Sequence, residues 1–239
     1  MGKVLVIADL KGEGIATPRG LELADKLGLQ AEVVAFTYAH LKALKVDATE
    51  RAGIKKRLLA DREAEVQKRI DKWIRPGQKV KLNVVWEKDV AAWTTHRCSR
   101  GGYDMVVKTG RRSESLAHTS TDWQLLRECP APVVIVAKKK WSRTKPVLAS
   151  LDLGSNLPVK KKLNQRILAQ AKALAEAMDS SLELICAIEV PVLLSDLDIV
   201  DPRSYAQNAK DEMAPHISAL AKQVDLPEKA FHVQRGPVE

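Results

Sequence analysis

The chain contains the same pattern of strands and helices twice. An apolar segment that ends in an acid opens each half, at Lys3–Asp9 and at Lys145–Asp152. In both halves a loop, a helix and a second apolar segment follow, and these second segments are residues 31–36 and 182–187. A repeat of this length indicates two copies of one domain, since solenoids repeat about every 20 to 50 residues. The first copy therefore predicts what the second should contain.

Strands alternate with helices in each copy, which predicts an α/β fold with a parallel, doubly wound sheet. Continuous apolar runs such as Val4–Ala8 are typical of strands buried on both faces. We expect the strand order 3-2-1-4-5, with the first strand central. Residues 1–139 should form a complete domain and residues 140–146 a basic linker. Residues 147–239 should form a second, incomplete domain that lacks the fourth and fifth strands.

The missing strands of the second copy lead to two further expectations. The chain is expected to be a fragment of a longer protein, because its 239 residues supply about one and a half domains of ~150 residues each. The strand at 147–151 is then expected to lie at the edge of its sheet, with an unpaired apolar side that invites aggregation.

Capping and breaking residues set the expected limits of the helices. Thr17 is predicted to cap the first helix with its hydroxyl, because Pro18 follows it in the first turn. Asp89 is predicted to cap a short helix, and Thr119 or Ser120 the last helix of the first copy. Apolar residues at helical spacing predict longer helices at 49–74, 160–178 and 204–223, and apolar runs predict strands at 80–86, 104–107 and 132–136.

The composition excludes a membrane-spanning chain and does not favour a nucleic-acid-binding one. No apolar run approaches the ~18 residues that a membrane helix needs. The net charge is +9, but the Lys and Arg residues are scattered, which favours solvated helix faces over a nucleic-acid or lipid surface. The three cysteines show no pairing pattern, so we expect reduced thiols in a cytoplasmic protein.

Motifs of catalytic or metal chemistry are missing from the sequence. The chain has neither a Gly-x-Gly-x-x-Gly after its first strand nor the Gly-Lys-Ser/Thr of a P-loop. His96 and Cys98 are two metal-ligand types close together, with Cys129 as a third candidate, but a closed zinc site needs four ligands. The acids at strand ends offer no acid–base pair. We therefore expect no enzymatic activity and no metal site.

The segment Thr121–Val136 carries a fairly specific motif. It contains Thr-Asp-Trp, then Leu-Arg-x-Cys-Pro-x-Pro and an apolar strand, and Asp104–Val107 precedes it. Together with Val84–Trp86, and with Asp152 before Leu-Gly-Ser, this motif resembles the universal stress protein family in its tandem-domain E type. The resemblance implies two Rossmann-like (adenine nucleotide alpha hydrolase-like) domains that form an internal pseudo-dimer. It also implies a stress-induced cytoplasmic protein associated with resistance to DNA-damaging agents.

The same resemblance implies where a nucleotide would bind. Members that bind ATP have an acid at the end of the first strand for the adenine amino group, and a glycine-rich loop after the fourth strand for the phosphates. In the first copy Asp9 is that acid, but only Gly110 remains of the loop. Arg111, Arg112 and Ser120 are then the candidates, with Gly110, to hold an anion. The alternative is a rewired loop without a phosphate site.

In the second copy the strand-end acid is Asp152. Gly154 and Ser155 follow it, and Val190 is expected to line the adenine slot. The counterpart of the phosphate loop falls in the absent part of the domain, so no ATP site can be completed from this chain. The residues alone establish no cofactor. The resemblance makes ATP the candidate cofactor and implies no other.

Three functions are compatible with these residues. The leading one is a non-enzymatic stress-response protein that binds an unknown small ligand or a partner, with a homodimer as one candidate assembly. The second is an adenine-nucleotide-binding switch that acts through a complete second domain. The third, association with nucleic acid through the basic surface, is the least favoured, because the cations are not clustered.

Overall fold

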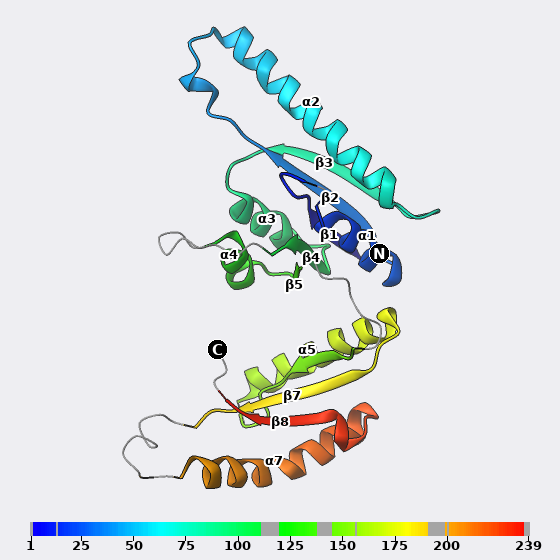
Figure 1. Cartoon of the computed structure of the whole chain (residues 1–239), viewed down its shortest axis with the longest axis vertical. Helices are drawn as coiled ribbons and strands as arrows, with labels where there is room; N and C mark the ends of the chain where they lie inside the picture. Colours follow the sequence, from blue (N-terminus) through cyan, green and yellow to red (C-terminus); the bar gives the residue numbers. More distant parts are fainter. Residues whose placement is uncertain are drawn as a thin grey trace. The chain divides into compact units, whose positions relative to one another are not determined.

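The computed structural model describes residues 2–12, 14–110, 120–137, 145–155, 157–190, 199 and 201–236. The chain divides into two compact units, residues 1–140 and 141–239. This division falls within the predicted linker at 140–146. Each unit has its own parallel sheet (Figure 1), and each is described by itself.

The first unit is built on a five-stranded parallel sheet with helices on its faces (Figure 1). Its strand order is β3-β2-β1-β4-β5, which confirms the predicted order. The central strand β1 pairs with both β2 and β4. In chain order the elements are β1 (Lys3–Ile7), α1 (Ala16–Lys26), β2 (Gln30–Thr37), η1 (Leu41–Ala43), α2 (Ala48–Trp73), β3 (Val80–Trp86), α3 (Val90–Ser99), β4 (Met105–Thr109), α4 (Thr121–Glu128) and β5 (Val133–Val136).

The apolar run of β1 is buried because helices cover both faces of the sheet. Val4, Leu5 and Val6 are all fully buried. Leu5 belongs to a core cluster that includes Leu125 of α4, whereas Val6 lies against Gly20 of α1. Successive side chains of a strand point to opposite faces, so β1 connects the two halves of the core. The prediction of a doubly buried strand is confirmed.

The predicted start of the first helix is wrong. α1 begins at Ala16. Its N-cap residue is Ile15, whose side chain makes no capping hydrogen bond. Thr17 lies inside the helix, is fully buried, and its hydroxyl has no hydrogen-bond partner. The cap comes instead from the carboxylate of Asp9, six residues before Ile15. The other predicted helices and strands agree with the structure within about two residues.

The second unit repeats the first half of this fold. Its three parallel strands have the order β6-β7-β8, which corresponds to β1-β2-β3. Ala171 and Ala175 of its first helix pack against Leu184 in a separate core cluster. The elements are β6 (Val147–Ser150), α5 (Pro158–Met178), β7 (Leu182–Ile188), α7 (Pro202–Val224), η2 (Glu228–Ala230) and β8 (Phe231–Arg235).

The strand β6 lies at the edge of its sheet in the described part of the chain. It corresponds to the central strand β1, but it pairs with β7 alone. Its residue Leu148 is 54% exposed, whereas residues 4–7 of β1 are buried. The expectation of an edge strand at this position is confirmed.

Two helix glycines provide a test of the packing around β1. A Cβ atom on Gly20 would lie 2.3 Å from a methyl carbon of Val6, whereas a Cβ atom on Gly53 of α2 would meet no atom within 4 Å. We expect Gly20→Ala to destabilise the first unit by about 1–3 kcal/mol through overpacking. Gly53→Ala should stabilise it by about 0.5–1 kcal/mol through helix propensity. Urea unfolding followed by circular dichroism measures both, and shifts of the same sign would contradict the described packing.

Candidate functional site

The candidate site of the first unit lies at the carboxyl ends of β1 and β4. The strand order of the sheet reverses between these two strands, and ligands of doubly wound folds bind in the crevice at such a point. Asp9 follows β1, Thr109 ends β4, and α1 begins beside both. These groups are bonded to one another within the protein.

The carboxylate of Asp9 is used as a helix cap. Its Oδ2 atom accepts hydrogen bonds from the backbone N–H of Ile15 at 3.0 Å, from that of Ala16 at 3.2 Å and from the hydroxyl of Thr109 at 2.8 Å. The Thr109 Oγ1 atom also accepts a bond from Ala16 N at 3.1 Å. An anion at a helix N-terminus is stabilised by the unpaired amides and by the helix dipole. One side chain thus fastens β1, α1 and β4 together.

The loop after β1 closes tightly around this carboxylate. Gly14 has a φ of +62°, and a Cβ atom at that position would lie 2.9 Å from Asp9 Oδ2. A side chain here would therefore be disfavoured both by the backbone conformation and by the contact. No local sequence pattern indicates that Gly14 lies against the carboxylate of Asp9.

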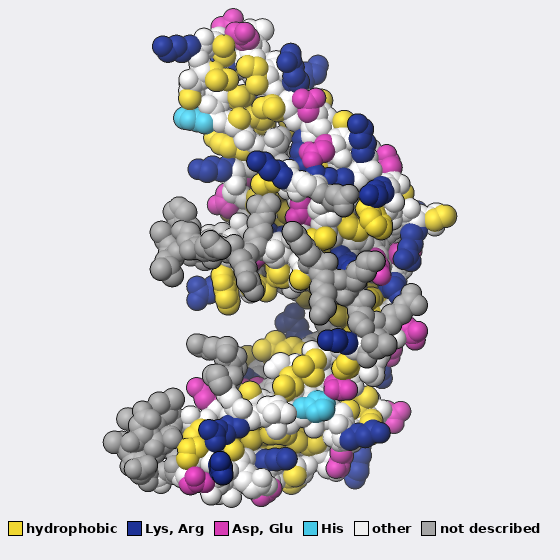
Figure 2. Space-filling model, in the orientation of Figure 1, with side chains coloured by type: hydrophobic (Ala, Val, Ile, Leu, Met, Phe, Trp, Pro, Cys, Tyr) yellow, Lys and Arg dark blue, Asp and Glu magenta, His cyan; other side chains and the backbone are white. Residues whose placement is uncertain are grey.

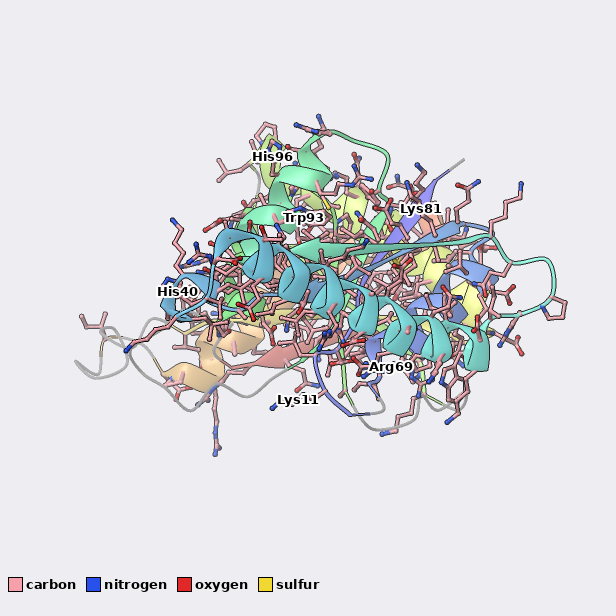
Figure 3. All side chains as sticks on the ribbon, turned by 90° about the horizontal axis from the view of Figure 1, so that it is seen from above. Lys11, His40, Arg69, Lys81, Trp93 and His96 are labelled. Carbon is pink, nitrogen blue, oxygen red and sulfur yellow. The ribbon has the colours of Figure 1, made fainter. Side chains whose placement is uncertain are left out.

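Two arginines of α2 hold the backbone of the same loop. Arg62 donates to the Asp9 carbonyl oxygen at 2.7 Å, and Arg69 donates to the same oxygen at 2.8 Å. Glu65 forms ion pairs with both arginines. Figure 3 shows Arg69 near the loop that carries Lys11. Because Arg62 is only 6% exposed, its guanidinium belongs to the interior of the unit and is not offered to a ligand.

The two described members of the predicted anion site, Gly110 and Ser120, also have partners. The backbone N–H of Gly110 donates to the carbonyl of Val136 at 2.9 Å. A Cβ atom on Gly110 would lie 2.7 Å from a methyl carbon of Ile135, so packing explains this glycine. The Ser120 hydroxyl caps α4 by accepting a bond from Trp123 N at 3.4 Å. The other two predicted residues, Arg111 and Arg112, lie outside the described residues.

A buried ion pair joins β4 to α4. Lys108 is 8% exposed, forms a salt bridge with Asp122 in the first turn of α4, and donates to the carbonyl of Thr109 at 3.0 Å. An acid at this position already satisfies the positive end of the helix dipole, which in a phosphate site would face the ligand. The Thr-Asp-Trp motif of the sequence contains Asp122, but no local pattern marks Lys108 as its partner.

The strand-end acid of the second unit has different surroundings. The Asp152 carboxylate is 44% exposed and forms an ion pair of 2.5 Å with Lys160 of α5. The side chain of Asn164 forms two hydrogen bonds with the backbone of Asp152. The Asn164 Oδ1 atom accepts from Asp152 N at 3.1 Å, and the Asn164 Nδ2 atom donates to the Asp152 carbonyl oxygen at 2.7 Å. Asp152 therefore lies beside the first two turns of α5, and its carboxylate is open to solvent.

The other predicted residues of the second unit lie along the same edge of the sheet. Gly154 and Ser155 follow β6, and Val190 follows β7. A Cβ atom on Gly154 would lie 3.2 Å from the terminal methyl of Met213, and the Ser155 hydroxyl accepts a bond from Leu157 N at 3.3 Å. The structure thus places the four predicted residues at the carboxyl ends of adjacent strands.

Comparisons with known proteins agree with this architecture. No protein-family model matches the chain. Universal stress protein E of Salmonella typhi is 24% identical over 241 residues, which covers 98% of this chain and 76% of the relative. A universal stress protein E homolog of Haemophilus influenzae is 24% identical over 217 residues, with coverages of 88% and 70%. The resemblance to the universal stress protein family is confirmed.

Solved structures show the same universal stress protein fold. A putative universal stress protein of Pseudomonas aeruginosa UCBPP-PA14 superposes with a TM-score of 0.65 at 18% identity. The alignment covers 98% of this chain and 74% of the Pseudomonas chain. A protein of unknown function from Pseudomonas aeruginosa PAO1 has a TM-score of 0.66, also at 18% identity and with the same coverage. At this identity the likeness concerns the fold.

In the described part of the first unit, the groups with clearly shifted pKa values lie away from Asp9. Burial, then hydrogen bonding to Glu32, raises the pKa of Tyr103 to about 12, and Glu32 also pairs with Arg97 at 3.0 Å. These groups lie near the start of β2 and before β4, so they fasten the opposite end of the sheet. Burial next to Cys129 raises the pKa of Cys98 to about 12, which describes an unreactive thiol.

Metal and membrane functions find no support in the described residues. No three His, Cys, Asp or Glu side chains there are arranged to hold a metal ion, so His96, Cys98 and Cys129 do not form a metal site. No helix in the described part of the chain has the length and the hydrophobicity that crossing a membrane requires.

The two strand-end acids form a matched pair for mutagenesis. Asp9→Ala removes three hydrogen bonds, two of them from backbone amides at the start of α1, so we expect it to destabilise the first unit by about 1–2 kcal/mol. Asp152→Ala removes one exposed ion pair and should cost less than about 1 kcal/mol. Urea unfolding midpoints of the full chain measure the difference. Equal effects of the two substitutions would disprove the capping role of Asp9.

Proposed function

We propose that this chain acts in the stress response by binding a ligand or a partner, and not by catalysis. Its relatives are named universal stress protein E, which supports the stress role. The observation that carries the non-catalytic role is the use of Asp9. The acid that the family resemblance assigns to adenine has its Oδ2 atom occupied by three donors of the protein itself.

The first unit is proposed to be a scaffold. A nucleotide at its switch point would compete with the α1 cap of Asp9 and with the Lys108–Asp122 pair. It would also need the Gly110 amide, which bonds to Val136. Leaving buried polar or charged groups unpaired costs about 1–3 kcal/mol each, so the internal contacts are favoured over a weakly bound ligand.

A second candidate function is an adenine-nucleotide-binding switch in the second unit. The observation in its favour is the exposure of Asp152, whose carboxylate caps no helix and pairs only with Lys160 among its described contacts. An exposed ion pair is worth about 0–1 kcal/mol, so an adenine amino group can displace it at little cost. ATP is the ligand proposed for this candidate.

The finer assignments of the family resemblance are also proposals for this chain. They are a cytoplasmic location, an internal pseudo-dimer of the two units, a homodimer and a role in resistance to DNA-damaging agents.

The role in resistance to DNA-damaging agents is tested by survival after ultraviolet irradiation in a strain that lacks the gene. Restored survival on re-expression supports the role, and unchanged survival of the deletion strain rejects it.

Calorimetry and a turnover assay with ATP separate the two candidates. We expect purified protein to release no phosphate from ATP above the background of an enzyme-free sample, because no acid–base pair among the described residues faces a nucleotide position. If ATP binds, Asp152→Ala should weaken the binding at least tenfold, whereas Thr109→Ala in the first unit should not change it. Multiple turnovers that a site substitution abolishes would overturn the non-catalytic proposal.

A further inference from the structure

We propose that the N-terminal half of α2 and the adjoining ends of β2 and β3 bind single-stranded nucleic acid. The surface is defined by Tyr38, Leu44, Lys55 and Trp86 and is called the overhang surface. It contains neither of the strand-end acids, and its role goes beyond the proposed function.

Two aromatic rings meet at the centre of the overhang surface. Thr37 of β2 is the register partner of Trp86 in β3, so Tyr38 emerges beside the last residue of the neighbouring strand. The Tyr38 and Trp86 ring centroids are 5.7 Å apart at an interplanar angle of 52°. The Lys55 ammonium lies 5.3 Å from the centre of the Trp86 ring. Tyr38 is 47% exposed, so a large part of this residue is open to solvent.

These apolar groups are not part of the core of the first unit. The buried residues of α2 are Arg62, Val66 and Ile70, all in its C-terminal half. The N-terminal half extends past the sheet (Figure 1), and Leu44 before it is 43% exposed. Figure 2 shows hydrophobic side chains gathered over this end of the unit, with Lys and Arg around them. Contiguous exposed apolar groups with a charged rim are typical of a binding surface.

The charge of this segment selects an anionic partner. Residues 38–57 contain six Lys and Arg against two acids, a net charge of +4 within twenty residues of a chain with +9 in total. One of the two acids, Asp47, caps α2 by accepting a bond from Glu50 N at 2.7 Å. The sequence alone did not show that α2 brings Lys55 beside the Trp86 ring at the end of β3.

Aromatic rings among cations fit unpaired bases better than they fit other anions. Single-strand-binding surfaces combine cations for the phosphates with aromatic side chains on which bases stack, and such stacking tolerates any base sequence. The bases of a duplex are stacked on each other and cannot use Tyr38. A purely apolar partner would gain nothing from the excess of Lys and Arg.

Fluorescence anisotropy with labelled oligonucleotides tests the proposal on the full chain. The probes are oligo(dT) and oligo(rU) of about 15 nucleotides, the upper range of a single-strand site, and heparin serves as an anion without bases. We expect Tyr38→Ala to weaken oligonucleotide binding about 5- to 100-fold, and Tyr38→Phe to retain most of the affinity. The two oligonucleotides distinguish DNA from RNA as the partner.

Trp73 supplies the matched control. It is 48% exposed, and the Lys72 ammonium lies 5.5 Å from its ring centre, but it lies at the other end of α2. Trp73→Ala should leave the affinity unchanged. Lys55→Gln should lower the slope of log affinity against log salt by about one. Circular dichroism confirms that each variant is folded.

Three outcomes would overturn the proposal. The first is absence of oligonucleotide binding at low salt. The second is binding that Tyr38→Ala leaves unchanged and heparin matches, which would show a purely electrostatic interaction. The third is self-association of the protein that Tyr38→Ala abolishes while oligonucleotides do not bind, which would assign the overhang surface to a second copy of the chain.

Discussion

The carboxylate of Asp9 holds together the part of the protein on which the rest of the first unit depends. It binds the start of α1 and the end of β4 while it remains at the end of β1. Arg62 and Arg69 fix the backbone of the same residue from α2. Four elements, β1, α1, α2 and β4, therefore meet at one residue. Because the Oδ2 atom of Asp9 already accepts three hydrogen bonds, this carboxylate serves the fold.

The second unit shows that the sequence repeat does not extend to the chemistry of the strand-end acid. Asp9 and Asp152 occupy equivalent positions, yet Asp9 caps a helix, whereas Asp152 is open to solvent and pairs with Lys160. The difference follows from neighbours that the repeat does not share. Thr109 of β4 approaches Asp9, while β6 has no second partner strand among the described residues.

The cations of the first unit fall into two groups with different uses. Lys108, Arg62 and Arg69 are directed inward and bind acids or carbonyl oxygens. Lys55 instead lies over the Trp86 ring, in a segment, residues 38–57, that carries a net charge of +4. Net charge alone cannot distinguish these uses, because a buried, paired lysine and a solvent-facing one contribute equally to the total.

The sequence by itself determined the α/β class, the two copies, the order of the first sheet and most element limits. The fold class and the element limits follow from apolar runs and helical spacing, which are local properties of the chain. The two copies follow from the repeat, and the sheet order is the one expected of a doubly wound fold. Only the tertiary structure decided that Asp9 and not Thr17 caps α1, that Lys108 pairs with Asp122, and that Tyr38 meets Trp86. Each of these contacts joins residues from separate elements. Local sequence patterns do not show which separate elements come into contact. The role of the strand-end acids was decided by their packing neighbours, because a carboxylate binds whichever donors the folded chain brings to it.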